Sequence, residues 1–146
     1  MGLGFEYLER LSGSYRRDDP DAQDVPMTLV LRISFDTIGG LIATRSASLT
    51  GHIRAVGLST VGTVFGRVVI ERGPEIIYDL VFSDDAGRTL RLVAKKRGLS
   101  ADPYAGLTTL QGTVEDDRGT LVASVLLRFD PRADLGGLLS SFRLRL

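Results

Sequence analysis

The chain has 146 residues, with 18 basic side chains, 18 acidic side chains and one histidine, so its formal net charge is zero. This length fits one domain over residues 1–146 with a full hydrophobic core, and the absence of net charge argues against a nucleic-acid binder that neutralises phosphates. Because there is no cysteine, the sequence excludes a disulfide framework and a thiolate metal site, and a single histidine excludes a histidine-rich zinc site.

The N-terminal segment does not resemble a secretory signal peptide. Glu6 and Glu9 lie where such a peptide needs a basic start and an apolar centre. No apolar run in the sequence approaches the roughly 18 residues that a membrane-spanning helix requires. We therefore expect a cytoplasmic protein without a transmembrane segment.

The first 26 residues contain a segment that could be a helix or a strand, followed by a polar segment. Over residues 3–13, Phe5, Leu8 and Leu11 recur at helical spacing, but an extended edge segment is also compatible with the sequence. Residues 14–26 are polar and contain two prolines, which predicts a surface loop.

Three strands are predicted in the next part of the chain. Strict alternation of apolar and polar residues predicts a strand over residues 27–35, after which Asp36 would cap a short helix at residues 38–42. Further strands are expected over residues 46–56 and 63–71. His52 lies on the polar face of the second strand, and the sequence supplies no partner that would orient it as a base, which indicates an ordinary surface histidine.

Two β-hairpins follow. The first spans residues 75–97 and turns at Asp85-Ala86-Gly87, where glycine can adopt a positive φ. Its inward faces are predicted from alternation, with one set on each strand: Ile76, Tyr78, Leu80 and Phe82, then Leu90, Leu92 and Ala94. A loop is expected at residues 98–105, and the second hairpin joins residues 107–115 to 120–129. Asp130 and the apolar spacing up to Phe142 predict a C-terminal helix.

Together, these elements predict a mainly β, antiparallel protein of about seven strands, with a short helix after the first strand and another at the C-terminus. Long alternating strands tend to close on themselves because closure removes exposed edges. The sequence therefore favours a small barrel of calycin or lipocalin-like shape. A β-sandwich is the alternative, since it shows the same period of two.

Motifs for catalysis, metals and cofactors are absent from the sequence. It contains no nucleophile elbow, phosphate loop or dinucleotide fingerprint, and its acidic pairs are typical of turns. We predict no catalytic residue, no metal and no cofactor. Three residues are candidates for polar groups near a ligand pocket: Tyr78, whose ring shares a face with core residues, Lys95 at a strand rim, and Thr109 in a strand.

Several short segments occur in an order that is similar to a known family. They include Phe5-Glu6, Ile77-Tyr78-Asp79-Leu80-Val81-Phe82, Asp85-Ala86-Gly87-Arg88, Thr108-Thr109-Leu110 and Leu138-Leu139-Ser140-Ser141-Phe142-Arg143. The order resembles a small β-barrel accessory domain associated with bacterial cholesterol-oxidase-like flavoproteins of the GMC type and with α/β-hydrolase or patatin-like proteins. The chain departs from the pattern at Ala94, where the family has glycine, and just before Thr108-Thr109-Leu110, where Tyr104-Ala105-Gly106-Leu107 replaces the usual aromatic. The resemblance implies an accessory role in lipid or sterol metabolism, without a flavin.

These observations predict a non-enzymatic module that binds a small apolar or lipid-like ligand, with an oxidoreductase or hydrolase as the expected partner. Two other classes are open. One is a protein-interaction or self-association module, which an exposed apolar patch would favour. The other is a cofactor-free isomerase or cyclase, for which Asp79 with Arg91 or Lys95 is the candidate ionisable pair.

Overall fold

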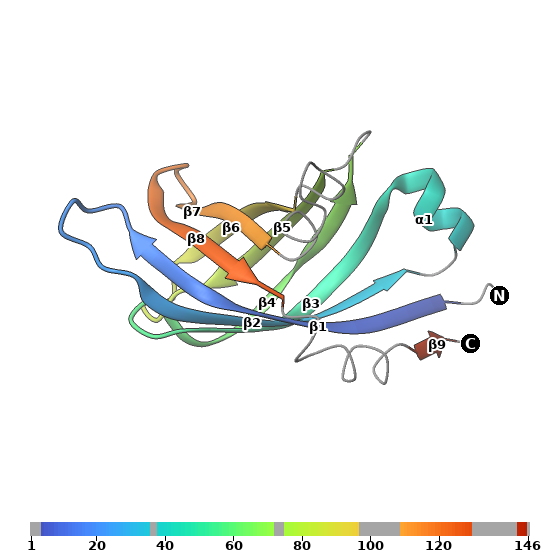
Figure 1. Ribbon diagram of the computed structural model, residues 1–146, viewed down its shortest axis with the longest axis horizontal. Coiled ribbons are helices and arrows are strands. Elements are labelled where there is room, and N and C mark those ends of the chain that lie inside the picture. Colours follow the sequence, from blue (N-terminus) through green and yellow to red (C-terminus); the bar gives the residue numbers. More distant parts are fainter. Residues whose placement is uncertain (1–3, 36–37, 72–74, 97–108, 130–142, 146) are drawn as a thin grey trace.

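The computed structural model describes residues 4–35, 38–71, 75–96, 109–129 and 143–145 (Figure 1). These residues form nine strands and one helix. In chain order they are β1 (Gly4–Arg17), β2 (Val25–Phe35), α1 (Ile38–Thr44), β3 (Ser46–Ala55), β4 (Ser59–Ile70), β5 (Ile76–Ser83), β6 (Thr89–Lys96), β7 (Thr109–Asp116), β8 (Leu121–Arg128) and β9 (Arg143–Arg145).

Strands β1 to β8 form a closed antiparallel barrel. Each strand from β2 to β8 pairs with the next, and β1 pairs with both β8 and β2. The short β9 adds to the first residues of β1. This closure confirms the predicted mainly β barrel and rules out the sandwich. The barrel has eight strands instead of about seven, because the ambiguous N-terminal segment is itself a long strand.

Strand β1 also shortens the predicted surface loop at residues 14–26. It continues to Arg17 and pairs with β8 from Ser12 onward, so the connection to β2 covers only residues 18–24. Tyr15 lies inside the barrel with 2% of its surface exposed, while Arg16 points to solvent. The polar composition of this segment reflects the outer face of a strand.

The other described elements agree with their predicted ranges to within a few residues, including the short helix after β2. The predicted helix cap at Asp36, the loop at residues 98–105 and the C-terminal helix lie outside the described residues. In the described part of the chain, no helix is long and apolar enough to cross a membrane.

Glycines within β3 and β4 mark places where neighbouring strands come very close. A β-carbon at Gly66 would overlap the main-chain carbonyl oxygen of Asp79 on β5, and one at Gly51 would overlap that of Val30 on β2. Only glycine leaves room for such an approach. Both residues therefore help the sheet to curve into a barrel, whereas the register shift in β3 falls between Ile53 and Ala55.

The antiparallel order gives the barrel two different ends. The connections β1–β2, β3–β4, β5–β6 and β7–β8 lie at one end, which we call the turn end. Helix α1, between β2 and β3, lies at the opposite end, which we call the helix end (Figure 1). Between them, alternate side chains of all eight strands form an apolar core.

Candidate functional site

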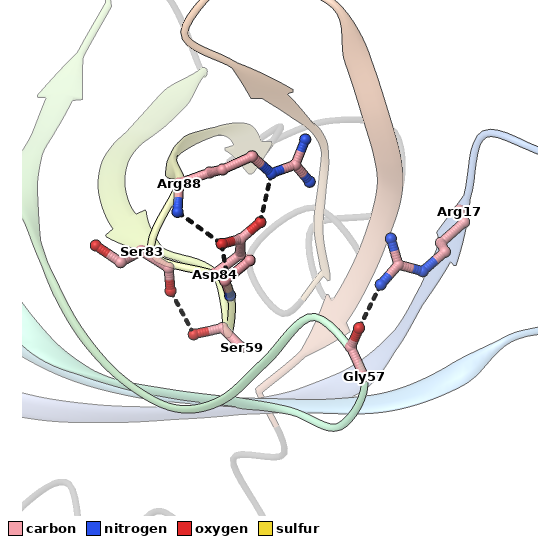
Figure 2. A network of polar contacts seen from close by, with 7 residues as sticks. Arg17, Gly57, Ser59, Ser83, Asp84 and Arg88 are labelled. Atoms are coloured by element: carbon pink, nitrogen blue, oxygen red, sulfur yellow. Dashed lines mark hydrogen bonds and ion pairs between the residues drawn. The ribbon is translucent and has the colours of Figure 1, made fainter.

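At the turn end, side chains of β1 hold the β3–β4 connection in place. Leu58 of this connection is buried, with 2% of its surface exposed. The Tyr15 hydroxyl donates a hydrogen bond to the carbonyl oxygen of Val56. The Arg17 guanidinium donates to the carbonyl oxygen of Gly57, as Figure 2 shows. The connection is thus folded over the barrel and tied to β1.

The neighbouring β5–β6 connection is held in a similar way (Figure 2). The Ser59 hydroxyl donates to the carbonyl oxygen of Ser83 at 2.8 Å, linking β4 to the end of β5. The Asp84 carboxylate accepts hydrogen bonds from the Arg88 main-chain N–H at 2.7 Å and from its Nε at 2.8 Å. With two of its four connections fixed by such contacts, the turn end is a structural closure.

Toward the helix end, three polar side chains meet inside the barrel: Glu9 of β1, Tyr78 of β5 and Lys96 of β6. The Tyr78 hydroxyl donates to Glu9 Oε1 at 2.7 Å, and Lys96 Nζ donates to Glu9 Oε2 at 2.8 Å. Lys96 Nζ also lies 5.0 Å from the centre of the Tyr78 ring, within the range of a cation–π contact. We call these residues the interior polar cluster.

The cluster is almost completely shielded from water. Glu9, Lys96 and Tyr78 expose 7%, 5% and 2% of their surfaces. Their strand neighbours on the interior face are Leu11, Leu80 and Ala94, which are buried, and Tyr7 and Ile76, which are partly buried. A buried ion pair loses so much hydration that its attraction often only offsets the cost, and apolar replacements are frequently as stable. Stability alone is therefore a weak explanation for the presence of these three polar residues in the barrel interior.

Burial and the nearby carboxylate keep two tyrosines protonated. Burial, followed by the charge of Glu9, raises the pKa of Tyr78 well above its ordinary value. The same two causes, in the same order, raise the pKa of Tyr7. Both hydroxyl groups consequently remain hydrogen-bond donors at neutral and moderately alkaline pH, and Tyr78 uses its proton toward Glu9.

We expect this shift to be visible in an alkaline titration followed by phenolate absorbance. In the folded protein, Tyr78→Phe should not reduce the phenolate signal at about pH 11, one unit above the usual tyrosine pKa, because Tyr78 is still protonated there. In denaturant, the same substitution should remove one tyrosine equivalent. Since the unfolded chain releases this proton near pH 10 and the folded chain does not, stability should fall as the pH rises above about 10. A loss of signal in the folded variant would contradict the burial of this hydroxyl.

The three residues predicted from the sequence lie in different environments. Tyr78 is inside the barrel, with its hydroxyl bonded as expected for a buried tyrosine. Lys95 points outward, with 55% of its side chain exposed and an ion pair to Glu75 at 3.7 Å. Thr109 is half-buried at the start of β7, where the next residue, Leu110, faces the core. The structure thus brings Tyr78 together with Lys96 and Glu9, and not with Lys95 or Thr109.

The ionisable pair considered for catalysis lies on the outer face of the barrel. Arg91 Nη2 is 2.6 Å from Asp79 Oδ2, and 58% of the Arg91 side chain is exposed. The hydrogen bond from Arg91 holds the pKa of Asp79 below its ordinary value. His52 is also exposed on the outer face, as predicted. Among the described residues, no group of three histidine, aspartate or glutamate side chains could hold a metal ion.

A cleft of about 630 Å³ lies at the helix end of the barrel. Its wall combines the apolar residues Phe35, Leu41 of α1 and Ala47 with polar residues that include Ser34, Ser48 and Arg67. Phe35 and Leu41 pack against the core, so the cleft borders the interior. Ala47 is paired with Val68 on β4, and Val68 is paired with Tyr78 on β5. The cleft and the interior polar cluster therefore lie at the same end, although none of the three cluster residues is part of the cleft wall.

Comparisons of the chain with protein-family models, with curated proteins and with solved structures give no match. The resemblance to an accessory barrel domain accordingly stays a prediction from the sequence. A function has to be argued from the geometry of the helix end.

Proposed function

We propose that the chain is a non-enzymatic binding module that receives a small, largely apolar ligand at the helix end of the barrel. The observation that carries this proposal is the charged, hydrogen-bonded cluster buried within an otherwise apolar interior. Ligand pockets have this composition, with mostly apolar walls and a few fixed polar groups that orient the ligand. Apolar residues often provide as much stability as a buried ion pair, so ligand binding would explain why the barrel contains this cluster.

The structures of the two barrel ends also support entry of the ligand at the helix end. The turn end is closed by Leu58 and by connections tied to the barrel wall. The helix end carries the cleft of about 630 Å³, which falls within the usual 300–1,000 Å³ of small-molecule sites. Its walls combine the apolar side chains of Phe35 and Leu41 with polar side chains such as Ser34, Ser48 and Arg67.

In this proposal the protein would act in the cytoplasm, accessory to lipid metabolism, and would exchange its ligand with an oxidoreductase or hydrolase. The interaction-module alternative has less support. The exposed large apolar side chains of the described residues are distributed over several elements, with Leu8 on β1, Val61 and Phe65 on β4, and Leu126 on β8. Single exposed apolar residues are normal on protein surfaces and need no partner.

The proposal is tested with a neutral naphthylamine dye whose fluorescence rises in apolar surroundings. We expect saturable, one-to-one binding to the purified protein. Ala47→Phe, which enlarges a buried side chain at the cleft wall, should weaken binding about tenfold or more, because Ala47 is 8% exposed and borders both the core and the cleft. Thr50→Phe, on the exposed outer face of the same strand, serves as the matched control and should bind the dye like the wild type.

Thermal unfolding of both variants would verify that each is folded. Fluorescence that rises without saturation, or equal affinities for the two variants, would contradict a site at the helix end. A native mass spectrum of the protein as isolated adds an independent measurement, since a stoichiometric adduct would give the mass of the ligand.

A further inference from the structure

The charges of the interior polar cluster cancel within the cluster. Among the described residues, Glu9 and Lys96 are the charged residues that are buried, and their Oε2 and Nζ atoms lie 2.8 Å apart. The interior thus carries one negative and one positive charge, already paired. An ionised ligand would add a third charge with no partner, which is very unfavourable where water is excluded.

The cluster offers a ligand both hydrogen-bond donors and hydrogen-bond acceptors. The ammonium group of Lys96 has three donors, of which one is directed at Glu9 Oε2. The carboxylate of Glu9 has about four acceptor positions and, from the described residues, receives one bond on each oxygen, from Tyr78 and from Lys96. A ligand group at this place can therefore accept from Lys96 while donating to Glu9.

A hydroxyl group matches these requirements, and a carboxylate does not. A hydroxyl both donates and accepts and carries no charge. A carboxylate only accepts, so it could use Lys96 but would lie against the like charge of Glu9, and repulsion between two close carboxylates is strong.

We propose that the interior polar cluster receives the hydroxyl group of a neutral alcohol with an apolar body, and that it discriminates against the corresponding carboxylate. This inference rests on the proposed binding function and specifies its ligand class. Glu9 sets the preference through its negative charge, Lys96 donates to the ligand oxygen, and Tyr78 keeps Glu9 in position through its hydrogen bond.

The test compares two ligands with the same apolar body, dodecanol and dodecanoate, by displacement of the naphthylamine dye at neutral pH. We expect the wild type to bind dodecanol at least tenfold more tightly than dodecanoate. Glu9→Gln removes the negative charge and leaves the cation of Lys96 without a counter-ion, so the preference should invert in favour of dodecanoate. Glu75→Gln is the matched control, because Glu75 is exposed and pairs with the outward Lys95.

The outcomes separate this inference from the proposed function. If the dye binds but dodecanoate is bound as tightly as dodecanol, or if Glu9→Gln leaves the preference unchanged, the binding module stands and the alcohol preference is overturned. If neither ligand nor the dye binds, the proposed function itself fails.

A second measurement decides the question if Glu9→Gln does not fold. In the wild type, mild acidification protonates dodecanoate and removes its charge, whereas dodecanol is unaffected. The apparent affinity for the fatty acid should therefore rise toward that of the alcohol as the pH falls, with the alcohol affinity constant. If the apparent affinities for the two ligands changed in the same way over this pH range, the inference would be overturned.

Discussion

Replacing Lys96 with methionine should lower the free energy of unfolding by about 3–5 kcal/mol, which is the usual cost of breaking a buried ion pair by removing one partner. The apolar stem of methionine fills much of the same space, so lost packing is a minor part of the effect. The main part is Glu9, which is 7% exposed and would keep, among the described residues, the Tyr78 hydroxyl as its one hydrogen-bond partner. Urea unfolding, followed by a structural probe, measures the change.

The adjacent Lys95 provides a control with the same chemistry. Its side chain is 55% exposed and its ion pair with Glu75 spans 3.7 Å, so Lys95→Met should change stability by no more than about 0.5 kcal/mol. The double variant Glu9→Leu/Lys96→Met should regain most of the loss, because apolar replacement of a whole buried pair is often neutral or stabilising. Equal effects of the two lysine substitutions would contradict the buried pair.

The fold was predictable where one face of a strand is uniformly apolar. In β2, the alternation from Met27 to Phe35 corresponds to the buried positions of the structure. In β1, the inward face includes Glu9, and the outward Leu8 is 39% exposed. A charged residue inside and a leucine outside disguise the period of two, which is why this strand could not be distinguished from a helix by sequence alone.

The candidate site was predictable only in part. The inward position of Tyr78 was predictable because it alternates with Ile76 and Leu80, and Tyr78 is buried in the structure. Continuing the series Leu90, Leu92 and Ala94 by two residues leads to Lys96, so the alternation itself indicates the inward lysine. Composition obscures this signal, because lysines at strand ends are usually solvated.

The position of Glu9 in the cluster had no comparable signal. It lies 69 residues before Tyr78 and 87 before Lys96 along the chain, and the two contacts depend on barrel closure. Local periodicity cannot indicate which strands become neighbours across a barrel interior. A buried charge of one sign needs a partner, and that requirement is satisfied here only in three dimensions.

Phe82→Ala should lower the free energy of unfolding by about 3–5 kcal/mol, as is usual for truncation of a buried phenylalanine. Phe82 is 2% exposed and pairs with Leu90 next to the turn end. Phe65→Ala is the matched control, since Phe65 is 58% exposed and lies on the outer face, paired with Val81. We expect this second variant to lose less than about 1 kcal/mol, and urea midpoints of the two variants give the comparison directly.

The same variant also tests whether the two ends of the barrel have separate roles. If the turn end is a structural closure and the helix end holds the ligand, folded Phe82→Ala should bind the naphthylamine dye almost as well as the wild type despite its lower stability. Ala47→Phe should show the reverse, with weaker dye binding and a smaller loss of stability, because overpacking costs about 1–3 kcal/mol. A loss of dye binding in Phe82→Ala, measured where that variant is fully folded, would instead indicate a site that extends through the whole barrel.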